Sequence, residues 1–123
     1  MPPPPVDLGG TVEQLAVGHD HSCVLLGSGN VRCSGRGLTF GSLGYASTDN
    51  VGDDPGEMPP PDVDIGGKAV QVFASGISFS TCALLEDQTL RCWGYNKFGQ
   101  LGYGHTNHIG DDETPASAGP VPY

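Results

Sequence analysis

The chain repeats itself. Segment 1–10 returns as segment 58–67, both running from Met through a proline stretch to a closing Gly-Gly. A Cys-x-Leu-Leu segment at 23–26 returns at 82–85, and a Gly-x-Leu-Gly-Tyr segment at 41–45 returns at 99–103. A repeat of this length is typical of units that cannot bury their hydrophobic faces alone and therefore stack on their neighbours. The sequence thus predicts two units, repeat 1 at 1–57 and repeat 2 at 58–123.

Glycine and proline exclude a helical bundle. The 123 residues include 20 Gly and 11 Pro, which interrupt every long helical window. The second unit instead has short β-prone runs at 69–74, 81–85 and 89–93, and a tight polar connection joins the last two. Three or four short strands cannot bury both faces of a sheet by themselves. We therefore predict an all-β fold, two blades of a β-propeller built from short antiparallel strands.

The composition of the chain excludes two classes of partner. Lys and Arg total 5 against 14 Asp and Glu, so the net charge is −9. An acidic chain repels phosphate backbones, and we expect no nucleic-acid partner. No apolar run approaches the roughly 20 residues that span a bilayer, so we expect no membrane partner. Met1 leads straight into four prolines, with no basic start and no apolar segment, so we expect no signal peptide in this chain.

The four cysteines form two pairs with the same spacing. Cys23 and Cys33 are ten residues apart, as are Cys82 and Cys92, and each pair is symmetric about a predicted hairpin turn. Residues opposed across antiparallel strands have Cα atoms about 4.5–5.5 Å apart, which a disulfide can bridge. The alternative is two pairs of buried, reduced cysteines; zinc is disfavoured because no Cys-x-x-Cys motif exists. We predict the disulfides Cys23–Cys33 and Cys82–Cys92, and hence an oxidising compartment.

Other polar motifs have a structural and a functional interpretation. His19 and His21 flank Asp20 and have metal-ligand side chains, but we expect structural roles for them. The acidic turns at 52–54 and 110–112 could offer oxygen ligands to calcium, although such turns usually bond their own backbone. No nucleophile–base pair and no complete metal set stands out. We expect a non-catalytic protein with no cofactor and no metal site.

Two segments resemble a known family. Segment 18–26, Gly-His-Asp-His-Ser-Cys-Val-Leu-Leu, resembles the Gly-x-x-His-[Ser/Thr]-Cys-Ala-Leu signature of regulator-of-chromosome-condensation repeats. Segment 93–104, Trp-Gly-Tyr-Asn-Lys-Phe-Gly-Gln-Leu-Gly-Tyr-Gly, is similar to the Trp-Gly-x-Asn signature of the same family. The resemblance implies a propeller, usually of seven blades, that mostly serves as a binding scaffold. Members include a guanine-nucleotide exchange factor and a bacterial β-lactamase inhibitor. The paired cysteines resemble bacterial, secreted members, which implies an extracellular or cell-surface location.

The two repeats depart from the signatures at different places. Ser34 stands where repeat 2 has Trp93, and Ala46 replaces a usual Gly. In repeat 2, Gln88 replaces the turn Gly, and segment 75–81 lacks the His. We expect Trp93 and Phe98 to pack between the blades.

We interpret the chain as a module that binds a protein partner through its Gly-rich loops. These loops differ between the repeats while the strands agree, and loops on rigid scaffolds often bind partners. A small-ligand or glycan-binding module and a purely structural, self-assembling fragment are the alternatives. Two blades expose apolar flanks, so we also expect a homo-oligomer of three or four chains, or packing against other blades of the same parent protein. The predicted contact residues are Arg36, Phe40, Tyr95 and Lys97.

Overall fold

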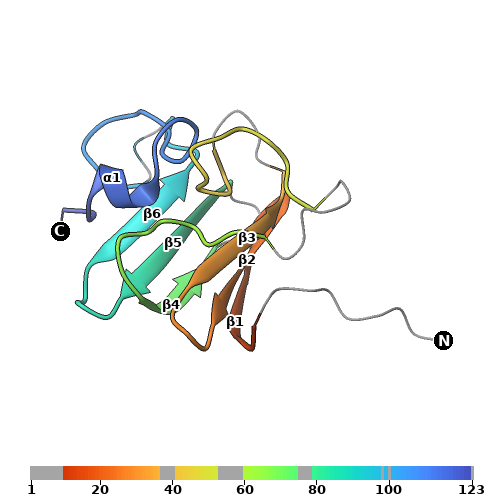
Figure 1. Cartoon of the computed structure of the whole chain (residues 1–123). Helices are drawn as coiled ribbons and strands as arrows, with labels where there is room; N and C mark the ends of the chain where they lie inside the picture. The colour runs from red at the N-terminus through yellow and green to blue at the C-terminus, as the bar shows by residue number, and fades with distance from the viewer. Residues whose placement is uncertain are drawn as a thin grey trace.

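The computed structural model of the chain describes residues 10–36, 41–52, 60–74, 79–97, 99 and 101–122. It contains two three-stranded antiparallel sheets, ordered β1-β2-β3 and β4-β5-β6 (Figure 1), here called blade 1 and blade 2. This confirms the predicted all-β fold of two propeller blades, to which the structure adds a short helix after blade 2. The elements are β1 Val12–Val17, β2 His21–Leu26, β3 Val31–Gly35, β4 Ala69–Phe73, β5 Ser80–Leu85, β6 Leu90–Gly94 and α1 Pro115–Ala118.

The hairpins place the cysteines as their spacing predicts. Cys23 pairs in register with Cys33, and Cys82 pairs with Cys92. Each pair is joined as a disulfide with its Cα atoms 4.1 Å apart. The turns between the strands have the same shape but different residues. The backbone takes a positive φ at Gly29 (+89°) in blade 1 and at the equivalent position in blade 2, where +70° falls on a glutamine.

A further extended segment borders each blade. The Val63 amide donates to the Val31 carbonyl at 2.7 Å beside β3, and Val121 makes the equivalent bond to Leu90 beside β6 at 2.7 Å. Residue 63 belongs to the range 58–123 that the sequence assigns to repeat 2. The edge of blade 1 is therefore bordered by chain from the second sequence repeat, which ties the two units together.

A tyrosine holds each of these border segments in place. The Tyr45 hydroxyl accepts the Cys33 amide at 2.9 Å and lies 2.8 Å from the Cys33 carbonyl and 2.7 Å from the Pro61 carbonyl. Tyr103 repeats this arrangement in blade 2, between Cys92 and Gly119. Removal of the phenol from water raises the pKa of Tyr45 to about 12, so the hydroxyl keeps its proton near neutral pH.

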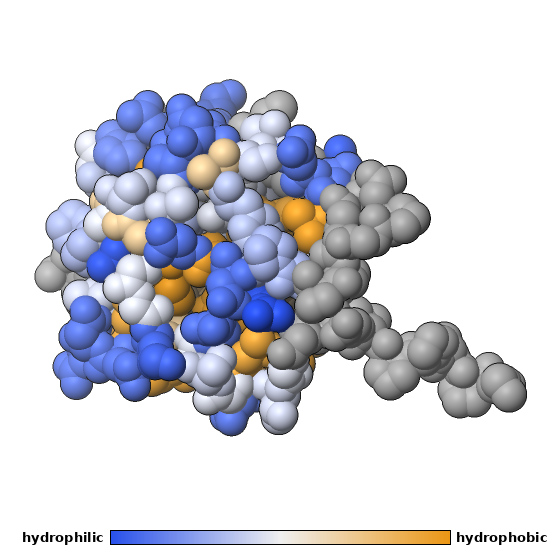
Figure 2. All heavy atoms as spheres, in the orientation of Figure 1, coloured by the Kyte–Doolittle hydropathy of each residue, from blue (hydrophilic) through white to orange (hydrophobic). Residues whose placement is uncertain are grey.

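The core lies between the two blades. One hydrophobic cluster draws residues from both sheets, and β4 contacts both β1 and β2. Trp93 is 0% exposed and packs against Gly44 of repeat 1, so it lies between the blades as predicted; Phe98 lies outside the described residues. Hydrophobic side chains also reach the surface in the middle of the molecule, between hydrophilic regions (Figure 2). Among the described residues, no helix is long and apolar enough to cross a membrane.

Two polar links join the blades within this core. The imidazole Nε2 of His21 lies 2.7 Å from the Thr81 hydroxyl, and the Val72 amide donates to the side-chain oxygen of Gln14 at 3.0 Å. His21 is 5% exposed, and burial lowers its pKa, so the ring stays neutral near pH 7. Because buried polar groups are costly when unpaired, these links fix how blade 2 sits on blade 1.

Candidate interaction surface

The two blades present the same ends in the same direction. The hairpin turns at 27–30 and 86–89 form what we call the turn end, and the loops before β2 and β5 and after β3 and β6 form the loop end. At the loop end, the Arg36 amide donates to the Asp20 carbonyl at 3.0 Å and the Tyr95 amide donates to the Phe79 carbonyl at 3.2 Å. Two predicted contact residues, Arg36 and Tyr95, thus occupy equivalent places in the two blades.

Four rings form a continuous row across the loop end, here called the aromatic row. His19 of blade 1 contacts Phe79 of blade 2 with ring centroids 4.7 Å apart. Phe79 meets the Tyr95 ring edge-on at 6.2 Å, and Tyr95 stacks on His108 at 5.3 Å. Residues 89 positions apart in the chain are thereby joined in one surface feature. Aromatic pairs at such distances add about 0.5–1.5 kcal/mol beyond the burial of their area.

An ion network extends the aromatic row toward Arg36. One carboxylate oxygen of Asp20 lies 3.0 Å from His19 Nδ1 and 3.1 Å from the Arg36 guanidinium. The hydrogen bond from His19 and the nearby positive charge of Arg36 hold the pKa of Asp20 below its usual value. The Arg36 side chain is 62% exposed, so its guanidinium remains available to a partner.

Asn96 fixes the loop that presents Tyr95 and His108. It is fully buried, and its amide nitrogen donates to the His105 carbonyl at 3.1 Å and the Asn107 carbonyl at 2.7 Å. Its side-chain oxygen accepts the Leu101 amide at 3.0 Å, and its own backbone amide donates to His108 Nδ1. One side chain therefore satisfies three backbone groups of a loop that has no regular secondary structure.

An acidic cluster lies beside the row. Asp111, Asp112 and Glu113 place carboxylate oxygens within 4.8 Å of one another. Together with Thr106, Asn107 and His108 they line a hollow of about 350 Å³. Burial and the neighbouring carboxylates, Asp112 first among them, raise the pKa of Glu113 to about 7. The Gly110 amide donates to Glu113 at 2.7 Å and the Asp112 amide to Asp111 at 2.9 Å, so the turn bonds its own backbone.

The structure locates three of the four predicted contact residues. Tyr95 belongs to the aromatic row and Arg36 lies at its end, while Lys97 is exposed two residues beyond Tyr95. Phe40 lies outside the described residues.

Sequence reasoning missed three members of the row, His19, Phe79 and His108. In the sequence, His19 and His21 stand as a pair of metal-ligand types, but the structure separates their roles, since His21 is buried against blade 2 and His19 pairs with Asp20. No local pattern marks Phe79 or His108, because their contacts exist only once the blades have packed.

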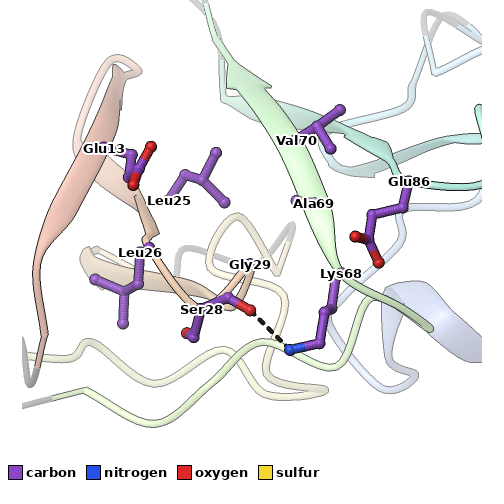
Figure 3. A pocket seen from close by; sticks show the side chains of 10 residues that line it. Glu13, Leu25, Leu26, Ser28, Gly29, Lys68, Ala69, Val70 and Glu86 are labelled. Atoms are coloured by element: carbon purple, nitrogen blue, oxygen red, sulfur yellow. Dashed lines mark hydrogen bonds between the residues drawn. The ribbon is translucent and has the colours of Figure 1, made fainter.

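A second hollow lies at the turn end, between the blades (Figure 3). It has a volume of about 340 Å³ and a partly apolar lining that includes Leu25, Leu26 and Val70. The Lys68 ammonium reaches across it and donates to the Ser28 carbonyl at 2.8 Å. Lys68 therefore bridges the two blades at the end opposite the aromatic row.

Paired three-stranded sheets, stacked face to face with equivalent loops at one end, define a module of β-propeller blades. The chain belongs to the family of the regulator of chromosome condensation (RCC1) repeat, whose family model matches residues 12–41 and 70–100. No curated protein matches the chain by sequence.

Solved structures support the same fold. Prp20p from Saccharomyces cerevisiae, described with its binding properties to Gsp1p and histones, superposes with a TM-score of 0.65 at 21% identity over 86% of this chain and 26% of its own. A chain in the structure of Kap60 bound to yeast RCC1 (Prp20) gives 0.64 at 21% identity, covering 93% of this chain and 26% of that one. Human WBSCR16 gives 0.60 at 25% identity, covering 84% and 25%. The chain thus spans about a quarter of the length of these propellers.

Proposed function

We propose that the chain is a non-catalytic propeller module that binds a protein partner through its loop end. The aromatic row carries this proposal. It joins loops of both blades into one surface, and Asp20 links its His19 end to the exposed guanidinium of Arg36. Aromatic and arginine side chains contribute most of the binding energy in many protein interfaces. Prp20p, a structure with the same fold, is described as binding Gsp1p and histones, and this supports a protein partner for the present module.

The charge of the chain suggests the chemistry of that partner. The net charge is −9, and the cluster of Asp111, Asp112 and Glu113 adjoins the row. We expect a partner whose contact surface carries basic residues, because complementary charge accelerates association and excludes wrong partners. The two cysteine pairs at disulfide distance favour an oxidising location. We propose that the encounter takes place outside the cell or at its surface.

A capture experiment with matched variants tests the site. The chain is immobilised as wild type, as the fourfold alanine variant of Arg36, Phe40, Tyr95 and Lys97, and as a turn-end control with Lys68→Ala. Proteins secreted by the source cells are passed over all three and identified by mass spectrometry. We expect a partner retained by the wild type and the control but lost on the fourfold variant. For that purified partner, Tyr95→Ala should weaken binding and raise the dissociation constant by about tenfold or more. Equal retention on all three surfaces contradicts the assignment.

A glycan-binding function is the second candidate. Glycan sites commonly combine an exposed ring with carboxylates, and here Tyr95 stacks on His108 beside the hollow lined by the acidic cluster. A glycan array probed with the wild type and with Tyr95→Ala separates this candidate from protein binding. Glycan signals that disappear in the variant favour it, and a blank array rejects it.

A further inference from the structure

The two blades are matched residue by residue, and this reveals what each open face lacks. Ala16 is opposite Cys23 in blade 1 as Phe73 is opposite Cys82 in blade 2. We call this side the front face; the front of blade 1 packs on blade 2. Ala16 is 5% exposed there, whereas Phe73, on the front of blade 2, is 42% exposed.

The opposite, or back, face shows the same contrast. Val72 pairs with Ala83 on the back of blade 2, which packs on blade 1, and Val72 is 5% exposed. The equivalent residue on the back of blade 1 is Leu15, which pairs with Val24 and is 62% exposed. One molecule therefore contains a completed front-to-back interface and, at its two flanks, exposed parts of a second one. On the back of blade 1 the exposed part is β1, since Val24 and Leu26 of β2 are only 6% and 4% exposed.

The site that holds the Trp93 indole, here called its seat, is filled in one blade and exposed in the other. Gly44 has a φ of +82°, lies beside Val63 and is buried under the indole of Trp93. Gly102 has the equivalent geometry, with a φ of +86° and a neighbouring Val121, but it is exposed. Blade 2 thus keeps a seat of the kind that Trp93 fills in blade 1.

We propose that a second copy of this chain docks head to tail, with the back face of its blade 1 on the front face of blade 2. The occupant is argued from continuity with the interface already inside the molecule, since the chain itself carries the partner of each exposed face. Inside the molecule, the side chain of Gln14 accepts the Val72 amide. The equivalent residues are Gln71 and Leu15, so Gln71 can accept the Leu15 amide of the next copy in the same way. This proposal does not depend on what the loop end binds.

The interface between copies is weaker than the internal one. Ser34 occupies the register position of Trp93. Ser80 occupies the position of His21, and Ser22 occupies the position of Thr81. The contact therefore lacks the buried indole and the imidazole–hydroxyl link. An interface between unlike faces continues from copy to copy until it closes as a ring or extends as a filament. Three or four chains of 12.7 kDa complete six or eight blades, with masses of about 38 or 51 kDa.

Two variants that each damage one face provide the decisive test. Leu15→Asp places a charge on the back of blade 1, and Phe73→Asp places one on the front of blade 2. By light scattering the wild type should give about 38 or 51 kDa, and each variant alone should give 12.7 kDa. Mixed one to one, they retain one intact back and one intact front, so they should form a dimer of about 25 kDa and stop there.

The matched control is Val70→Glu. Val70 is 49% exposed, but its equivalent at the strand bulge of blade 1 is already Glu13, so the fold accepts the charge there. This variant should keep the wild-type mass, and thermal melting should confirm that all the chains are folded. A wild-type mass of 12.7 kDa up to millimolar concentration overturns the proposal, as does a mixture that stays monomeric.

A gain of association gives a second readout. Ser34→Trp should fill the seat at Gly102 of the next copy and tighten self-association by about tenfold or more, because a buried tryptophan is among the strongest interface anchors. Adding Phe73→Asp to Ser34→Trp should abolish the gain. A Ser34→Trp chain that associates no more tightly than wild type contradicts the assigned register of the two faces.

Discussion

Blade 1 and blade 2 have the same backbone but keep different members of one set of packing residues. Blade 1 supplies the buried His21 and the turn glycine Gly29, whereas blade 2 supplies Thr81 and the buried Trp93. Each interface between blades takes one contribution from each side, and only the internal interface collects the complete set. The lack of a Trp in blade 1 and of a His in blade 2 therefore costs little inside the molecule, and its effect is concentrated at the two outer faces.

The largest expected effect on stability comes from replacing Trp93 by serine, the residue at the equivalent position of blade 1. Trp93→Ser removes a side chain that is 0% exposed and leaves a cavity above Gly44. We expect the free energy of unfolding to fall by about 3–5 kcal/mol in urea titrations at fixed protein concentration. Ser34→Ala is the control and should change it by less than about 0.5 kcal/mol. A loss below about 1 kcal/mol for Trp93→Ser would show that the blades do not depend on this contact.

The next effect compares the two disulfides. Each closes a short loop, so replacing a pair by serines should lower the free energy of unfolding by about 2–3 kcal/mol. The loss should be larger for Cys23–Cys33, because both residues are 0% exposed and serine hydroxyls would be buried between the blades.

Mass spectrometry checks that the bonds exist. The non-reduced chain should be lighter than the reduced chain by four hydrogens, two for each disulfide. Four thiols open to alkylation after aerobic purification would reject both bonds.

A smaller effect comes from exchanging the turn residues. Gln88 has a φ of +70°, which disfavours a residue with a Cβ, so Gln88→Gly should raise the free energy of unfolding by about 1 kcal/mol. The reverse change, Gly29→Gln, should lower it by at least as much, because a Cβ there would come within 2.8 Å of Lys68. Thermal melts of both variants measure the pair. The comparison fails if both changes shift stability in the same direction.

The smallest effect is a dependence on pH that differs between the blades. Burial lowers the pKa of His21 from 6.5, so below that pH the unfolded chain binds a proton that the folded chain does not. Its contribution to stability is complete above about pH 7 and is lost as the pH falls through the folded-state pKa. Glu113 acts in the opposite sense. Its pKa is raised to about 7, so its contribution is complete below about pH 4.5 and is lost as the pH rises through 7.

Two variants separate these slopes in melting experiments between about pH 4.5 and 8.5. His21→Ser, the residue of blade 2, should lose the decline in stability on the acid side. Glu113→Gln keeps an acceptor for the Gly110 amide and should lose the decline toward alkaline pH. An unchanged acid slope in His21→Ser would place the titrating group elsewhere.

Half of the predicted contact set could be located from the repeat alone. Arg36 and Tyr95 follow the last strands of their blades, and equivalent sequence positions in a repeat take equivalent positions in space. The remainder of the aromatic row could not be found this way. Its rings come from the loops before β2 and β5 and from residue 108, which the sequence does not relate to one another.

The sequence by itself determined the repeat, the strands and the opposition of Cys23 to Cys33 and of Cys82 to Cys92. These features depend on short-range rules, namely strand alternation and the symmetry of a hairpin about its turn. Only the tertiary structure decided that chain from repeat 2 borders blade 1, that Trp93 packs on Gly44, and that His19 contacts Phe79. Those contacts join residues that are far apart in sequence, and they form only when the front of one blade packs on the back of the next.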